Sequence, residues 1–120
     1  VTCTDCHSPH GVDAKPGKGT SLDDGNALCF KCHSDKRGPF VMEHEAMREG
    51  CVVCHKVHGS INDKMLVARD NNLCLRCHTQ VGFPSIAGGG HQDRLFEGSC
   101  YSADCHQGVH GSNFDDHLRE

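Results

Sequence analysis

Five pairs of cysteines, each followed directly by a histidine, are the residues of this 120-residue chain whose types and spacing suggest chemistry. The cysteines are Cys3 and Cys6, Cys29 and Cys32, Cys51 and Cys54, Cys74 and Cys77, and Cys100 and Cys105. The histidines that follow these pairs are His7, His33, His55, His78 and His106. Four pairs have the spacing C-x-x-C-H, and the last is stretched to C-x4-C-H.

This spacing is typical of covalently attached haem c. Two thiols on one helical turn can reach the two vinyl groups at one edge of a porphyrin. The imidazole of the next residue then binds the iron as its proximal ligand. The sequence therefore predicts five haem c groups.

Zinc and disulfides are the two alternative uses of so many cysteines. The 19 residues between Cys54 and Cys74 fit the spacing of a zinc ribbon, and ten cysteines suit a disulfide framework in an oxidising compartment. Neither alternative explains the five histidines. Chance would place a histidine after all five pairs only about once in a hundred thousand sequences of this composition.

Six further histidines are available as second, distal ligands of the irons. The candidates are His10, His44, His58, His91 and His110, with His117 as a spare or substitute. His10, His58 and His110 each follow a proximal histidine by three or four residues and precede a glycine. Eleven histidines cover the ten axial positions of five irons, so we expect two imidazoles on every iron.

These positions recur as a repeat of about 45 residues within one pentahaem domain that spans residues 1–120. A full unit has an upstream histidine, C-x-x-C-H-x-x-H-G, a loop and a second C-x-x-C-H. The quasi-repeats are residues 1–37, 38–80 and 81–120.

The repeat also suggests a scheme of ligation. If the upstream histidine serves the first haem of a unit and the histidine before glycine serves the second, the haem of Cys3 and Cys6 lacks a distal ligand. In the same scheme His110 lacks a haem. A neighbouring copy of the chain would solve both, and this is a hypothesis of ligation between subunits.

The expected fold follows from the scarcity of large apolar side chains. The chain has five Phe, one Tyr and no Trp, so porphyrin faces must supply much of the interior. Asn26 and Asn72 precede two of the motifs and are expected to cap the short helices that carry the cysteines. We predict a multihaem cytochrome c fold, mostly irregular coil with a few short α-helices and little or no β-structure.

The charge and hydropathy of the sequence limit which partners and which cellular locations we expect for the protein. The net charge of −4 and the scattered basic residues argue against nucleic acid. No stretch is long and apolar enough to insert directly into a membrane. The sequence opens at Val1 without Met, so we interpret it as a mature product whose signal peptide has been removed, in the periplasm or at the bacterial cell surface.

Iron with two imidazole ligands has no open position for a substrate but can pass an electron. We therefore expect an electron carrier rather than an enzyme, with redox proteins as partners. One alternative is a soluble periplasmic shuttle. Another is a multihaem reductase with one open-site haem, for which the stretched fifth motif beside the glycine-rich segment 88–91 is the candidate position.

GPFVMEHEAMREGCVVCHKVHGS at 38–60 and LCLRCH at 73–78 resemble multihaem cytochromes of the MtrA/DmsE type. That decahaem family implies a staggered chain of bis-histidine haems and anaerobic, metal-linked electron transport across the outer membrane. This chain has about half the haem motifs of such a protein, and its C-x4-C-H motif is similar to one in tetrahaem cytochromes of the c3 kind. Extracellular cytochrome filaments, in which one subunit can ligate its neighbour's haem, are a second resemblance.

Overall fold

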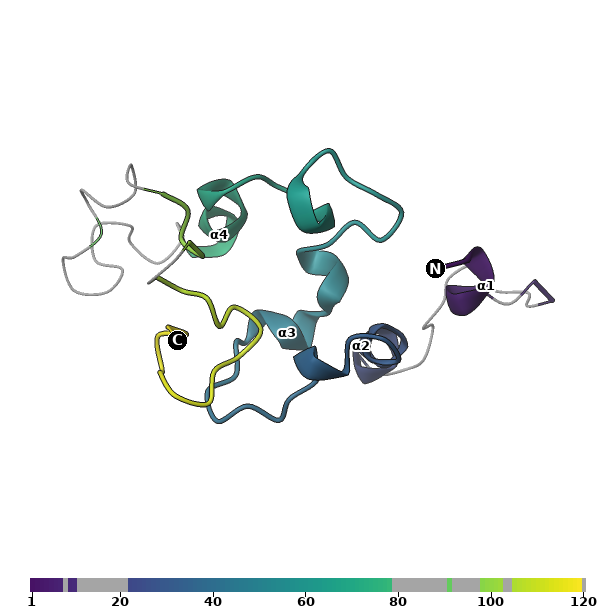
Figure 1. Cartoon of the computed structure of the whole chain (residues 1–120), viewed down its shortest axis with the longest axis horizontal. Coiled ribbons are helices and arrows are strands. Elements are labelled where there is room, and N and C mark those ends of the chain that lie inside the picture. The colour runs from purple at the N-terminus through teal and green to yellow at the C-terminus, as the bar shows by residue number, and fades with distance from the viewer. Residues whose placement is uncertain (8, 11–21, 79–90, 92–97, 103–104, 120) are drawn as a thin grey trace.

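The computed structural model describes residues 1–7, 9–10, 22–78, 91, 98–102 and 105–119 (Figure 1). Its α-helices are α1 (Cys3–Cys6), α2 (Leu22–Phe30), α3 (Ala46–Glu49) and α4 (Asn71–His78). Short 3₁₀ turns span Ser34–Lys36, Cys51–Val53 and Asp63–Met65. The described ranges contain no strand, only two isolated bridges, Met42 with Ser112 and His55 with Leu66. The predicted class, irregular coil with a few short helices, is confirmed.

One backbone hydrogen bond recurs where the cysteine motifs turn. The amide of the proximal histidine donates to the carbonyl of the first cysteine in His7 to Cys3, His33 to Cys29 and His55 to Cys51, at 2.8 to 3.0 Å. The stretched motif keeps the same bond, from His106 to Cys100 at 2.8 Å. Its two extra residues therefore enlarge the loop without separating the first cysteine from the histidine.

The predicted helix caps are wrong. Asn26 lies inside α2, and Asn72 is the second residue of α4. The residue equivalent to Asn26 is Asn71, since both stand three positions before the first cysteine of their motif. The side chains of these two asparagines bond to distant segments instead of capping their own helices.

A conventional hydrophobic core is absent from the described part of the chain, where Leu66 is the only buried hydrophobic residue. The chain exposes 9211 Å², whereas a folded protein of this mass exposes about 6300 Å². Its radius of gyration is 16.3 Å, against about 13.6 Å for a compact chain of this length. Both excesses indicate a chain whose own side chains do not form its interior, as the composition predicted.

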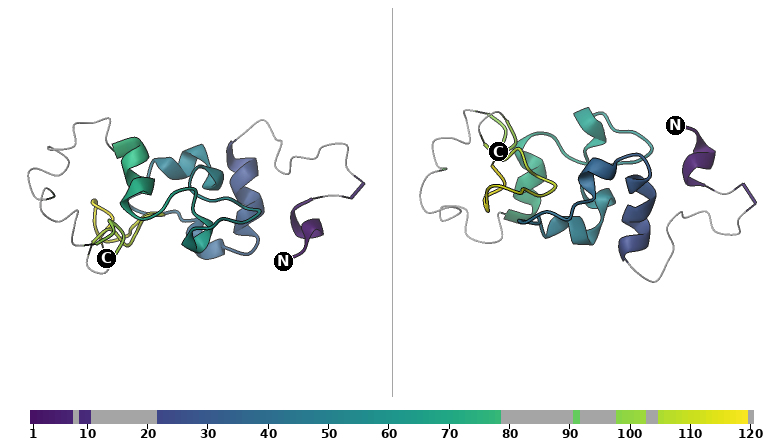
Figure 2. Two further views of the ribbon diagram at one scale, coloured as in Figure 1. Left: turned by 90° about the horizontal axis from the view of Figure 1, so that it is seen from above. Right: turned by 60° about the horizontal axis from the view of Figure 1, so that its bottom comes forward.

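The C-terminal segment returns to the middle of the chain, beside the residues that precede α3 (Figures 1 and 2). Met42 and Ser112 exchange two backbone hydrogen bonds of 2.8 and 2.9 Å, and Ser112 is almost fully buried. Gly111 lies against the ring of Phe40, so closely that a Cβ atom there would overlap the ring. These contacts hold the neighbouring His110 in place.

Candidate haem-binding sites

Eight histidines form four pairs whose rings face each other. In every pair, one histidine follows a cysteine pair and the other does not. The ring centres are 5.9 to 6.3 Å apart, and the ring planes are within 20° of parallel. The pairs are His7 with His58, His78 with His44, His55 with His110, and His106 with His91.

This spacing fits one metal ion between two imidazoles. Two metal–nitrogen bonds of about 2 Å each, together with the inner half of each ring, separate the ring centres by about 6 Å. Simple stacking of aromatic rings would not select one histidine from a motif and one from outside it four times. The residues therefore fit an iron with two histidine ligands.

Backbone carbonyls orient one ring in three of the pairs. Nδ1 of His44 lies 2.8 Å from the carbonyl of Val109, and Nδ1 of His55 lies 2.9 Å from that of Lys64. Nδ1 of His106 is bonded in the same way to the carbonyl of His117. A carbonyl only accepts, so Nδ1 carries the proton and Nε2 is left free to bind a metal.

The pairing differs from the scheme that the repeat suggested. His44 faces His78 of the second motif in its unit, not His55 of the first. His58 faces His7, far back along the chain. His110 faces His55 of its own chain, whereas the scheme left His110 without a haem in its own chain.

Three histidines stand outside these pairs. The described residues contain no ring facing His33, and His10 is exposed. The side chain of His117 lies 2.5 Å from the carboxylate of Asp116, while its carbonyl supports His106. His117 is thus engaged as a support of the fifth site, which leaves His10 as the remaining candidate partner of His33.

Successive attachment sites lie against one another. The thiols of Cys29 and Cys51 are within hydrogen-bonding reach, and burial, followed by the proximity of Cys29, raises the pKa of Cys51 to about 11. Burial also raises the pKa of Cys54, and the nearby Cys77 adds to the rise. The second, third and fourth motifs therefore meet in chain order.

The fourth and fifth motifs meet in the same way. The hydrogen bond between the thiols of Cys74 and Cys100 raises the pKa of Cys74 and lowers that of Cys100 to about 7. The two thiols therefore lie next to each other. Four consecutive motifs thus form one continuous series of sites.

The alternatives of disulfides and zinc find no support in this geometry. No disulfide joins any two of the ten cysteines. Among the described residues, which include every cysteine and histidine, one group alone brings three metal-binding side chains together: Asp115, Asp116 and His117. It contains no cysteine, so it is not a zinc ribbon.

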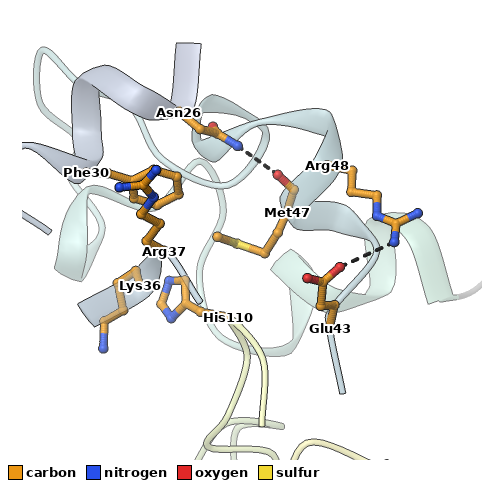
Figure 3. Close-up of a pocket in the computed structure, with 8 residues that line it drawn as sticks. All are labelled: Asn26, Phe30, Lys36, Arg37, Glu43, Met47, Arg48 and His110. Atoms are coloured by element: carbon orange, nitrogen blue, oxygen red, sulfur yellow. Dashed lines mark hydrogen bonds and ion pairs between the residues drawn. The ribbon is translucent and has the colours of Figure 1, made fainter. Parts of the chain in front are cut away.

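A cavity of about 500 Å³ is lined by Phe30 of the second motif and by His110, the partner of His55 (Figure 3). Phe30 and Met47 line it with apolar side chains, and its charged lining residues are Lys36, Arg37, Arg48 and Glu43. Burial, followed by the positive charge of Lys36, lowers the pKa of His110, and this favours the neutral imidazole that binds a metal. The lining suits a flat apolar group that carries carboxylates.

Cysteine–histidine motifs in series, paired histidines and a chain without its own core define a multihaem c-type cytochrome. The family model of the doubled CXXCH motif matches residues 1–38 and 44–83, so the chain belongs to this family of cytochromes with covalently bound haem c. The multiheme cytochrome MtrA of Shewanella baltica (strain OS185) is 42% identical over 122 residues, which cover 94% of this chain. The chain is MtrA-like and spans 35% of that relative's length. No helix in the described residues has the length and apolar character needed to cross a membrane.

Sequence reasoning missed Asn71 and the carbonyls of Val109, Lys64 and His117. The signal for Asn71 was present, because an asparagine stands three residues before Cys74 just as Asn26 stands before Cys29. The carbonyls carry no signal in the sequence, since every residue has one.

Proposed function

We propose that this chain carries electrons along five bis-histidine haems. The observation that supports this most directly is the set of four histidine pairs with ring centres 5.9 to 6.3 Å apart. In this proposal each pair holds one iron, and His10 completes the iron held by His33. Haem c supplies the one-electron chemistry, and the chain supplies the thioether bonds, both axial ligands and the spacing.

The geometry favours transfer over catalysis. When both axial positions of an iron are occupied by imidazoles, a substrate has no place to bind. Cys29 lies near Cys51, Cys54 near Cys77 and Cys74 near Cys100, so haems attached at these cysteines would be close to one another. Such a series is suited to conduct electrons from one redox protein to another.

We also propose a periplasmic or cell-surface location and a role in extracellular electron transport, as the family resemblance implies. A filament of such chains remains part of this proposal, but it does not depend on His110. His110 has a partner ring in its own chain, so copies would need to meet through other contacts.

The absorption spectrum of the purified holoprotein tests this function. We expect five haems per chain from the haem-to-protein ratio, and low-spin spectra in both the oxidised and the reduced states. Fewer haems, or a high-spin band in the unaltered protein, would contradict five bis-histidine sites.

The iron expected at His33 gives the sharpest test of which histidine is its distal ligand. We expect His10→Ala to produce one high-spin haem, because it removes the remaining candidate partner of His33. His117→Ala is the matched control and should leave all haems low-spin, since the carbonyl of His117 and not its ring supports His106. Electron paramagnetic resonance of both variants measures the spin states.

A reductase is the second candidate function, and it is favoured by His33, whose ring faces no other histidine ring in the described part of the chain. If the unaltered protein already has one high-spin haem and His10→Ala adds none, the iron at His33 is open to small ligands. Binding of cyanide or nitric oxide to that haem would then establish an open site.

A further inference from the structure

Two asparagines make the same set of contacts at equivalent places in the chain. Asn26 accepts a hydrogen bond from the amide of Cys51 at 2.9 Å and donates to the carbonyl of Met47 at 2.9 Å. Asn71 accepts from the amide of Cys100 at 2.6 Å and donates to the carbonyl of Gly98 at 3.0 Å. We call these two sets of contacts the asparagine clamps.

Each clamp joins one haem motif to the next. Asn26 belongs to α2, which carries Cys29, and it holds the first cysteine of the following motif. Asn71 has the same relation to the motif of Cys74 and to Cys100. Both ends of the amide are used, so the following segment is fixed at two points rather than one.

The burial of Asn26 adds to this argument. Asn26 is 8% exposed, and few other described residues are as buried. A buried amide is costly unless its hydrogen bonds are made, so the contact is stable only while Cys51 and Met47 stay in place. The amide of Cys51 and the carbonyl of Met47 are therefore held by one side chain that α2 positions.

The hydrogen bond from the backbone amide of Cys51 to Asn26 is compatible with haem attachment. In the free-thiol chain Asn26 also accepts from the thiol of Cys51 at 3.0 Å. A thioether has lost that proton, whereas the amide N–H of Cys51 remains a donor. The contact that lasts is therefore the one that fixes the backbone of the attachment site.

We propose that Asn26 and Asn71 are positioning residues that set the approach of the second haem to the third and of the fourth to the fifth. This inference rests on the proposed function, since it concerns the spacing of haems that carry electrons. It assigns no contact between an asparagine and an iron. The two clamps share no residue, so their effects should be independent.

The test compares Asn26→Ala, Asn71→Ala and the double variant with the unaltered holoprotein. We expect all five haems to stay attached and low-spin. Circular dichroism in the Soret region should lose part of the paired positive and negative signal that closely spaced haems produce, and the double variant should lose both parts. Exchange of the Cys51 amide with deuterium should be about tenfold faster in Asn26→Ala, because a hydrogen bond that restrains this segment is gone.

Two controls separate positioning from general damage. Asn72 is the neighbour of Asn71 in α4 and has an exposed side chain, so Asn72→Ala should leave the Soret signal unchanged. Asn26→Asp keeps an acceptor for the Cys51 amide and should retain more of the signal than Asn26→Ala.

An unchanged Soret signal in Asn26→Ala and Asn71→Ala would overturn the inference. Loss of a haem from these variants would also overturn it, because the asparagines would then be needed for attachment and not for spacing. Failure of the proposed function looks different, since the unaltered protein itself would lack low-spin haems or the paired Soret signal.

Discussion

Replacing His44 with alanine should make the iron held by His78 high-spin and leave the iron held by His55 low-spin. The rings of His44 and His78 face each other at 6.3 Å, and the carbonyl of Val109 fixes the ring of His44. One haem of the five should therefore lose an axial ligand. Electron paramagnetic resonance and the visible spectrum measure this change.

Removing attachment sites shows which haem is affected. In the background Cys74→Ser with Cys77→Ser, the haem in question is absent, so His44→Ala should add no high-spin signal. In the background Cys51→Ser with Cys54→Ser, the same replacement should still produce one high-spin haem. The opposite pattern would restore the scheme in which His44 serves the motif directly after it.

The local parts of each site could be predicted from the sequence. A proximal histidine is adjacent to its cysteine pair, so the chemistry of the haem fixes the spacing, and the backbone bond from His55 to Cys51 closes the turn. The scarcity of aromatic residues likewise predicted a chain without its own core. These features depend on residues only a few positions apart or on composition alone.

The facing histidine pairs could not be predicted, because they depend on long-range packing. His58 is 51 positions from His7, and His110 is 55 positions from His55. The repeat suggested that each unit supplies its own ligands, but the C-terminal segment docks on Met42 and brings His110 into the middle of the chain. A local pattern contains no information on that docking.

The asparagines show an intermediate case. Their position before the helical motifs suggested caps, which are local contacts. The structure uses Asn26 for a contact 25 positions away, and the equivalent residue is Asn71 rather than Asn72. The recurrence of an asparagine three positions before the first cysteine was visible in the sequence, whereas the residue that each asparagine bonds to was not.

Replacing Gly111 with alanine should destabilise the docked C-terminal segment and weaken the ligation of the third iron. Gly111 has φ of +138°, and an added Cβ would overlap the ring of Phe40. Backbone strain and overpacking each cost about 1–3 kcal/mol. Because His110 is the adjacent residue, part of the haem at Cys51 should become high-spin, and thermal unfolding followed at the Soret band should begin at a lower temperature.

Gly59→Ala separates the two causes. Gly59 also has a positive φ, +122°, but no atom lies within 4 Å of the position that a Cβ would take there, so this variant should show backbone strain alone. Phe40→Ala combined with Gly111→Ala removes the clash and should recover part of the low-spin signal. If Gly111→Ala shows no more high-spin haem and unfolds at no lower temperature than Gly59→Ala, the ring of Phe40 does not determine the position of His110. A larger loss of low-spin signal in Gly111→Ala than in Gly59→Ala, partly reversed by Phe40→Ala, would support the clash as its cause. Packing at Gly111 would then control the position of His110, which lies 55 positions along the chain from His55.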